Sequence, residues 1–259
     1  MNKIGSVLYP LLFGVLIFIL LQTGALQRLI GVDEFVLPLP SSIGAIIADS
    51  IPKVMLNVKA TLIASVGGLL LGSLFGYMIA VIATIFPKWG AGGLSVVAAF
   101  NAIPIVALAP VITNWTKDFS DSAEIRSMAA KIVVVMLMCT ATMSLNAYRG
   151  LTELKPFSKD LLETYAARET TIFLKLRLPN SVPYIFTALR VSVPLSVISA
   201  IVSEYFAEFI IGVGRQIREN IVLAQYSTAW AYIAVACLIG VLLYALLMII
   251  EGILLKNRK

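Results

Sequence analysis

The sequence contains no histidine and only two cysteines among its 259 residues. Without histidine there is neither a histidine-ligated metal site nor a catalytic triad that uses an imidazole base. The two thiols, Cys139 and Cys237, both fall inside apolar runs, where a cysteine is most simply a small buried side chain. We therefore expect no disulfide and no metal or catalytic site built on histidine, and we single out no other catalytic or metal-ligating residue in this chain.

Charge is also scarce. Only 13% of the residues are charged, about half the share usual in soluble domains, while 59% are hydrophobic and the mean hydropathy is +0.95. Lipid is the solvent that suits such a composition. The net charge of +6 comes from basic residues scattered along the chain, which favours basic cytoplasmic loops of a membrane protein over nucleic-acid binding.

Six apolar runs are long enough to cross a bilayer, which takes about 20 residues. They lie at 7–30, 55–86, 92–113, 129–149, 181–203 and 228–255. The first run is followed by no small-residue cleavage site, so we interpret it as a retained helix and not as a signal peptide. A short interfacial helix is expected at about 42–50. The sequence thus predicts an all-α polytopic membrane protein with a single domain over residues 1–259.

The basic residues also predict an orientation. With the amino terminus in the cytoplasm, 11 Lys and Arg residues fall on that side and 8, Lys131 among them, on the other. Cytoplasmic loops carry the excess of Lys and Arg in membrane proteins. We therefore expect a multi-pass protein with both termini cytoplasmic.

Two patterns predict packing and a surface helix pair. Gly68, Gly72 and Gly76 recur every fourth residue, which lets a neighbouring helix approach closely. In the polar stretch 150–178, apolar residues recur at spacings of three and four and are interrupted at 166–169, which predicts two short helices around a bend. On the pattern alone, this hairpin lies on the membrane surface or docks into a groove of a partner.

The same stretch resembles the cytoplasmic EAA loop of ATP-binding-cassette importer permeases. That family pattern is Glu-Ala-Ala, a Gly six residues after the Glu, an aromatic residue and then Leu-Pro. Counting back from Leu178-Pro179, Asp160 stands at the Glu, Ala166 at the Gly and Phe173 at the aromatic. Because a positive φ costs alanine more than glycine, we expect a bend of different shape at Ala166.

Other segments resemble the nitrate, sulfonate and taurine branch of these permeases, in order along nearly the whole chain. They are 37–41 (LPLPS), 103–110 (IPIVALAP), 180–185 (NSVPYI) and 212–214 (GVG). Residues 176–187 resemble the subset that carries riboflavin or pyrimidine vitamin precursors. Residues 114–126 depart most from the family pattern.

The resemblance implies a permease subunit in the bacterial plasma (inner) membrane, paired with a second permease copy. It implies two ATPase subunits on the loops, and an extracytoplasmic binding protein that delivers a small vitamin-like, pyrimidine, flavin or sulfonate-type solute. The chain has no G-x-x-x-x-G-K-[ST] motif, so ATP and Mg²⁺ are expected on the separate ATPase, with no cofactor here. The residues implied in ATPase coupling are Asp160, Leu161, Leu162, Glu163, Tyr165, Ala166 and Phe173.

Several polar residues and prolines within the spans are candidates for the translocation path, because ionisable groups at membrane depth are commonly functional. Each also has a structural interpretation: a packed kink, a side chain that reaches the interface, or a hydrogen bond between helices. The candidates are Asn101, Pro104 and Pro110 in the third span, Arg190, Ser192, Ser196 and Ser199 in the fifth, and Glu204 at the end of the fifth.

A different class of function is an integral membrane enzyme acting on lipid-type substrates. Such an enzyme needs acids or nucleophiles clustered near one interface, whereas the carboxylates of 150–178 are spread among apolar residues. A passive channel would not need the cytoplasmic hairpin. Co-purification of an ATPase separates the transporter from both alternatives.

Overall fold

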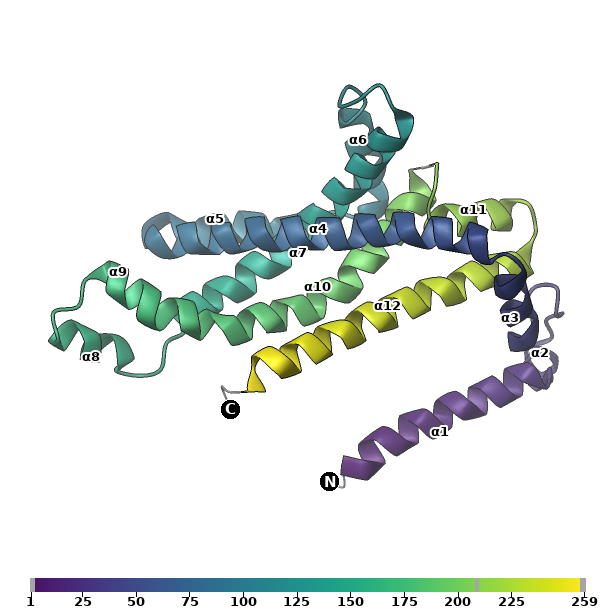
Figure 1. The fold of residues 1–259 in the computed structure, drawn as a ribbon, viewed down its shortest axis with the longest axis horizontal. Helices are drawn as coiled ribbons and strands as arrows, with labels where there is room; N and C mark the ends of the chain where they lie inside the picture. Colours follow the sequence, from purple (N-terminus) through teal and green to yellow (C-terminus); the bar gives the residue numbers. More distant parts are fainter. Residues whose placement is uncertain (1–2, 208–209, 257–259) are drawn as a thin grey trace.

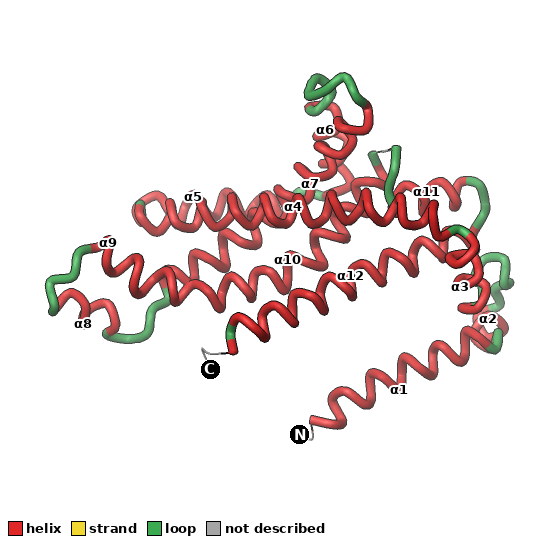
Figure 2. Tube along the Cα trace, viewed as in Figure 1, coloured by secondary structure: helices red, strands yellow, loops and turns green. Residues whose placement is uncertain are grey.

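The computed structural model describes residues 3–207 and 210–256, and within these ranges the chain is helical with no strand. Figures 1 and 2 show a long bundle with two different ends. The short helices α8 (Ser158–Thr164) and α9 (Glu169–Ile172) form one end, and α3 (Pro40–Asp49) and α11 (Val213–Val222) lie at the opposite end. The prediction of an all-α polytopic membrane protein is confirmed.

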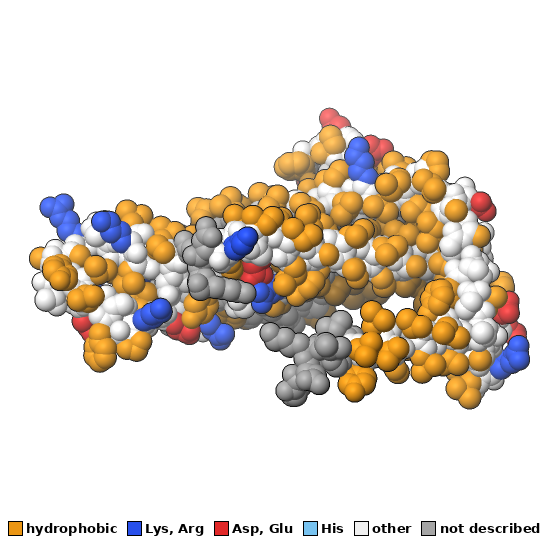
Figure 3. All heavy atoms as spheres, turned by 60° about the horizontal axis from the view of Figure 1, so that its bottom comes forward, with side chains coloured by type: hydrophobic (Ala, Val, Ile, Leu, Met, Phe, Trp, Pro, Cys, Tyr) orange, Lys and Arg blue, Asp and Glu red, His pale blue; other side chains and the backbone are white. Residues whose placement is uncertain are grey.

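Four helices form the shaft of the bundle: α4 (Ile51–Ile85), α7 (Ala123–Thr152), α10 (Leu178–Phe206) and α12 (Tyr226–Leu254). Each is long and apolar enough to cross a bilayer, and each extends a few residues beyond the run that predicted it at one end or both. Their outward residues are largely hydrophobic, as the visible face in Figure 3 shows. Apolar side chains turned outward from helices of this length are suited to lipid.

The third predicted span, 92–113, is not one straight helix. Helix α5 (Pro87–Ala99) and a 3-10 turn (Phe100–Ala102) are followed by α6 (Ile105–Trp115), and the chain bends by 100° between the two parts. Ile103, with φ −76° and ψ 122°, is extended because it precedes Pro104, whose ring disfavours a helical conformation in the residue before it. The single-helix prediction was wrong here, although Pro104 had marked the break.

The first predicted span, 7–30, is also divided. Helix α1 (Lys3–Gln22) ends before Gly24, which has φ 69°, and α2 (Ala25–Ile30) follows. A helix is found where the interfacial one was expected: α3 begins at Pro40, and its place at the membrane interface stays a prediction. Among the described residues, four helices meet the length of a span and the bent α5–α6 pair makes a fifth when counted as one, so six crossings stay a prediction.

Helices α4 and α7 pack against each other more closely than any side chain at the glycine positions of α4 would allow. A Cβ atom added at Gly72 would lie 2.6 Å from the carbonyl oxygen of Met136, and one at Gly76 would lie 2.6 Å from that of Thr140. The helices therefore meet backbone to backbone along the glycine stripe, as the four-residue spacing predicts. Helix α10 packs along α7, where Ala188 joins a buried cluster with Ala147 and Leu151.

Candidate functional site

The polar stretch 150–178 folds into the two short helices that its periodicity predicts. Helices α8 and α9 are separated by a bend, and a π-helical turn (Phe173–Arg177) carries the chain from α9 into α10. Ala166 lies in the bend with φ 53°. Its N–H donates to the Glu163 carbonyl oxygen at 2.8 Å, and the Ala167 N–H donates to that of Leu162 at 3.0 Å.

The alanine therefore adopts the left-handed conformation that suits glycine, at a cost of about 1 kcal/mol. The sequence analysis expected a bend of different shape because alanine disfavours a positive φ. That expectation is wrong for the φ of Ala166, which is positive.

The outer face of α8 exposes large apolar side chains. Phe157, Leu161 and Tyr165 are 81%, 59% and 78% exposed. Leu161 lies within α8, and Phe157 and Tyr165 flank the helix four residues to either side. We call these three residues the α8 ridge. Asp160 and Glu163 are also exposed, Leu162 is half-buried, and Glu163 pairs with Lys159 at 3.1 Å.

Phe157 was missed by the sequence analysis because it precedes the first residue of α8 and lies outside the family pattern. It adopts φ 62° directly before the helix. Its place four residues before Leu161 was the available signal. Phe173, in contrast, is half-buried and packs against the cluster of Ala147 and Leu151. It anchors the loop to the bundle and is not part of the exposed surface.

The loop is also fixed to the bundle by hydrogen bonds at its base. Arg177 Nη1 donates to the carbonyl oxygen of Leu151 at 2.9 Å. The Asn180 side-chain amide donates to the carbonyl oxygens of Gly150 and Glu153 at 2.8 and 3.1 Å. These acceptors lie at the carboxyl end of α7, where carbonyls have no partner within the helix. These bonds join the base of the loop to the carboxyl end of α7 and to the start of α10.

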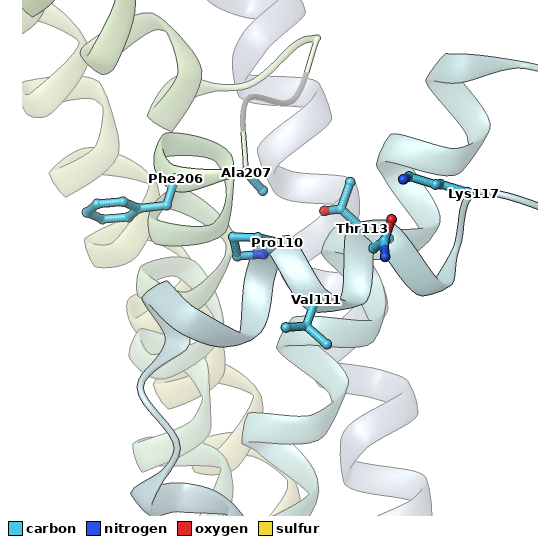
Figure 4. Close-up of a pocket in the computed structure, with 7 residues that line it drawn as sticks. Pro110, Val111, Thr113, Lys117, Phe206 and Ala207 are labelled. Atoms are coloured by element: carbon cyan, nitrogen blue, oxygen red, sulfur yellow. The ribbon is translucent and has the colours of Figure 1, made fainter.

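The proline and asparagine candidates of the third span are exposed. Pro110 lines an open groove of about 570 Å³ together with Thr113, Lys117 and Phe206 (Figure 4). Asn101 and Pro104 are exposed as well, but they do not line this groove. The structure thus places one of the three beside a hollow surface and the other two elsewhere on the bent segment.

The serine candidates of α10 do not face an open path within this chain. Ser192, Ser196 and Ser199 are fully buried. Ser196 Oγ donates to the Val193 carbonyl oxygen at 2.8 Å, and Cys139 Sγ on α7 lies 3.8 Å from the Ser192 carbonyl oxygen. The three serines pack inside the bundle, but the Ser196 hydroxyl bonds within its own helix, and Ser192 Oγ and Ser199 Oγ have no hydrogen-bond partner among the described residues. Their hydroxyls thus form no bond between helices here, and their assignment to the path stays a prediction.

Arg190 forms an ion pair between two shaft helices. Its Nε donates to Glu251 Oε2 on α12 at 2.8 Å, and a second hydrogen bond joins Nη2 to Oε1. The Arg190 side chain is 46% exposed and Glu251 is mostly buried. Glu251 lies one turn before the end of α12, so the pair sits near the same end of the helix as the carboxyl terminus. Arg190 is therefore a compensated charge.

Glu204 is completely buried, and so is its partner Lys131, which the orientation count had placed on the extracytoplasmic side. The two side chains meet at 3.3 Å between α10 and α7. The Thr61 hydroxyl of α4 donates to the Glu204 carboxylate at 2.9 Å, and the Gly214 N–H donates to it at 2.9 Å. Glu204 therefore has no contact with solvent in this conformation, and its assignment to the translocation path stays a prediction.

Comparison with known proteins gives one consistent result. Residues 68–259 match the model of the family described as binding-protein-dependent transport system inner membrane component. The formylaminopyrimidine transport permease protein ThiX of Halalkalibacterium halodurans is 27% identical over 260 residues, which cover 100% of this chain and 99% of that protein.

Two further relatives are shorter matches. A probable ABC transporter permease protein of Haemophilus influenzae is 28% identical over 199 residues, 76% of this chain and 77% of the relative. The riboflavin transport system permease protein RibX of Chloroflexus aurantiacus is 26% identical over 163 residues, 62% of this chain and 57% of the relative. All three relatives are named as permeases, and none is named as a membrane enzyme.

The family match spans most of the chain, including α8, α9 and the buried pair of Lys131 and Glu204. The chain belongs to the family of inner membrane components of binding-protein-dependent transport systems, the permease subunits of ATP-binding-cassette importers.

Proposed function

We propose that the α8 ridge docks into a groove on a cytoplasmic ATPase and transmits its movement to the membrane helices. The observation that carries this proposal is the exposure of Phe157, Leu161 and Tyr165 on a loop that is otherwise fixed to the bundle. Exposed aromatic and aliphatic side chains on one helical face are the usual anchors of a helix in a groove. Their attachment to α7 and α10 supplies the stiffness that coupling requires.

The complete importer would contain two copies of this permease, two ATPases and an extracytoplasmic binding protein. ATP and Mg²⁺ would bind on the ATPases, and both termini of this chain would face the cytoplasm together with α8 and α9. The family membership and the 11 to 8 distribution of basic residues support this arrangement. Closure of the two ATPases would then rock the helices between inward-open and outward-open states.

The test is to purify the tagged chain in mild detergent from a host that expresses its whole operon and to identify the companions by mass spectrometry. We expect an ATPase subunit in the purified complex, and a binding protein recovered when its ligand is supplied. Recovery of the chain alone from such a host would contradict the proposal and would revive the alternative of a membrane enzyme.

We further propose that the solute is a pyrimidine or flavin-type vitamin precursor. The full-length relative named for formylaminopyrimidine transport and the shorter one named for riboflavin transport support this choice. A sulfonate would favour an uncompensated positive charge in the path, whereas Arg190 and Lys131 are each paired with a carboxylate.

Uptake of labelled formylaminopyrimidine, riboflavin and taurine by cells with and without the operon tests the substrate class. We expect uptake of one of the two aromatic solutes to depend on the operon. Dependence of taurine uptake alone would contradict the choice.

A further inference from the structure

The segment that joins α10 to α11 has an unusual set of partners. Between Ile211 and Gly214, four successive backbone groups bond to side chains from three different shaft helices. The bonds are Lys131 Nζ to the Ile211 carbonyl oxygen (2.7 Å), the Gly212 N–H to Asn57 Oδ1 (3.0 Å), the Val213 N–H to Thr61 Oγ1 (3.0 Å) and the Gly214 N–H to Glu204 Oε2 (2.9 Å). Irregular backbone near membrane depth must find such partners inside the protein.

Two of these bonds cap α11. Val213 and Gly214 are its first two residues, and their N–H groups have no acceptor within the helix. The residue before the helix, Gly212, has no side chain to serve as a cap. Thr61 and Glu204 act as the cap from other helices, and a carboxylate is favoured at this position because the helix dipole is positive there.

Lys131 completes the arrangement. It is 1% exposed and Glu204 is fully buried, so each charge depends on the other for compensation. Removal of one member of such a pair leaves an uncompensated buried charge and is strongly destabilising. Because Lys131 also donates to the Ile211 carbonyl oxygen, the same ammonium group holds both the carboxylate and the incoming segment.

The shape of the segment allows little freedom. Gly212 has φ 151°, a conformation that L side chains rarely adopt, and a Cβ atom there would overlap the Glu204 carboxylate. A Cβ atom at Gly214 would overlap the backbone of Ile201 in α10. The segment fits against Glu204 in one close arrangement, and both glycines are required for the approach.

We infer that Lys131 and Glu204 are positioning residues that make segment 211–214 and α11 move as one rigid body with α4, α7 and α10 during transport. At the outer end of the permease, segment 211–214 and α11 then do not move independently of α4, α7 and α10. This role in transport rests on the proposed function, because its second test measures how far the loaded binding protein stimulates the ATPase.

The first measurement is amide hydrogen exchange of α11 in the purified importer complex in nanodiscs. We expect Glu204→Gln and Lys131→Met each to raise exchange in 213–222 by at least tenfold, with little change in α8 and α9. The double variant K131M/E204Q should change exchange less than either single variant, because no buried charge is left unpaired. Unchanged exchange in α11 in both single variants would overturn the inference.

Thr61→Val provides a variant that keeps all charges and almost the same volume. It removes one cap of α11, and we expect exchange at Val213 to rise several-fold in a protein that folds normally. Glu251→Gln is the matched control, because it breaks the ion pair of α12 far from α11. Equal exchange at Val213 in Thr61→Val and in the wild-type protein would count against the capping role.

The second measurement separates positioning from simple stability. With the ATPase still bound, we expect Thr61→Val and K131M/E204Q to lose part of the stimulation of ATP hydrolysis by the loaded binding protein, about two- to fivefold, while basal hydrolysis persists. Full stimulation of ATP hydrolysis despite fast exchange in α11 would show that a rigidly held α11 is not needed for coupling. Failure of the proposed function would be different: the wild-type complex itself would contain no ATPase.

Discussion

The two ends of the bundle differ in which side chains they bury and which they expose. At the α11 end, one set of polar groups turns inward, and Lys131, Glu204 and Thr61 are fully enclosed, although Val222 and Leu223 at the end of α11 are 74% and 59% exposed. At the end formed by α8 and α9, large apolar groups turn outward, and Tyr165 is 78% exposed. The buried polar set is satisfied within the chain, whereas the exposed apolar side chains of the α8 ridge need a partner to cover them.

The difference indicates that folding stability and coupling to the ATPase depend on separate groups of residues. Substitutions at the α11 end should lower the stability of the permease, and substitutions on the α8 ridge should leave stability intact and affect only the assembly. The following four substitutions test this division by melting temperature in detergent.

Lys131→Met should have the largest effect. It leaves the Glu204 carboxylate buried without its counter-charge, which costs about 3–5 kcal/mol and should lower the melting temperature by on the order of 10 °C. K131M/E204Q should recover much of the loss. A melting temperature for Lys131→Met equal to that of the wild-type protein would show that the pair contributes nothing to stability.

Glu251→Gln should have a smaller effect, although it also breaks an ion pair between shaft helices. Arg190 is 46% exposed and can turn toward the interface when its partner is lost. We expect a loss of about 1 kcal/mol or less and a decrease in melting temperature of about 2–4 °C. A decrease as large as that of Lys131→Met would contradict the distinction between the two pairs.

Ala166→Gly should be stabilising or neutral. Glycine relieves the left-handed strain at φ 53°, a gain of about 1 kcal/mol, part of which is offset by the greater freedom of the unfolded chain. The measurement is the melting temperature together with uptake, which should stay at the wild-type level. A lower melting temperature would show that the alanine methyl group makes a packing contact that its exposure does not suggest.

Tyr165→Ser should have the smallest effect on stability and a large effect on uptake. The exposed side chain contributes less than about 0.5 kcal/mol to folding, so the melting temperature of the isolated permease should not change. Uptake should fall at least tenfold. Thr170→Ala, at an exposed position on α9, is the control and should retain uptake. Normal uptake by Tyr165→Ser would argue against the α8 ridge.

Local pattern was sufficient for much of the fold. Long apolar runs predicted the four shaft helices, the glycine spacing predicted the contact of α4 with α7, and the periodicity of 150–178 predicted two helices around a bend. Pro104 indicated the break in the third span, but the 100° angle depends on how α6 packs against α7 and α10, which no local signal contains.

The buried cluster could not be predicted in the same way. Lys131 and Glu204 are 73 residues apart, and Lys131 lies near the start of the predicted span 129–149, where the orientation count assigned it to the extracytoplasmic side. The sequence also singled out Ser192, Ser196 and Ser199, but it could not tell whether their side chains meet a path or a neighbouring helix. These questions are decided by tertiary packing.

The most direct test of the central claim is the amount of ATPase that co-purifies with Leu161→Ser/Tyr165→Ser, compared with Thr170→Ala and the wild-type chain. The account predicts that the ridge variant folds with a normal melting temperature and loses the ATPase, while Thr170→Ala retains it. An equal amount of ATPase on the ridge variant would contradict the claim that α8 couples ATP hydrolysis to the membrane helices.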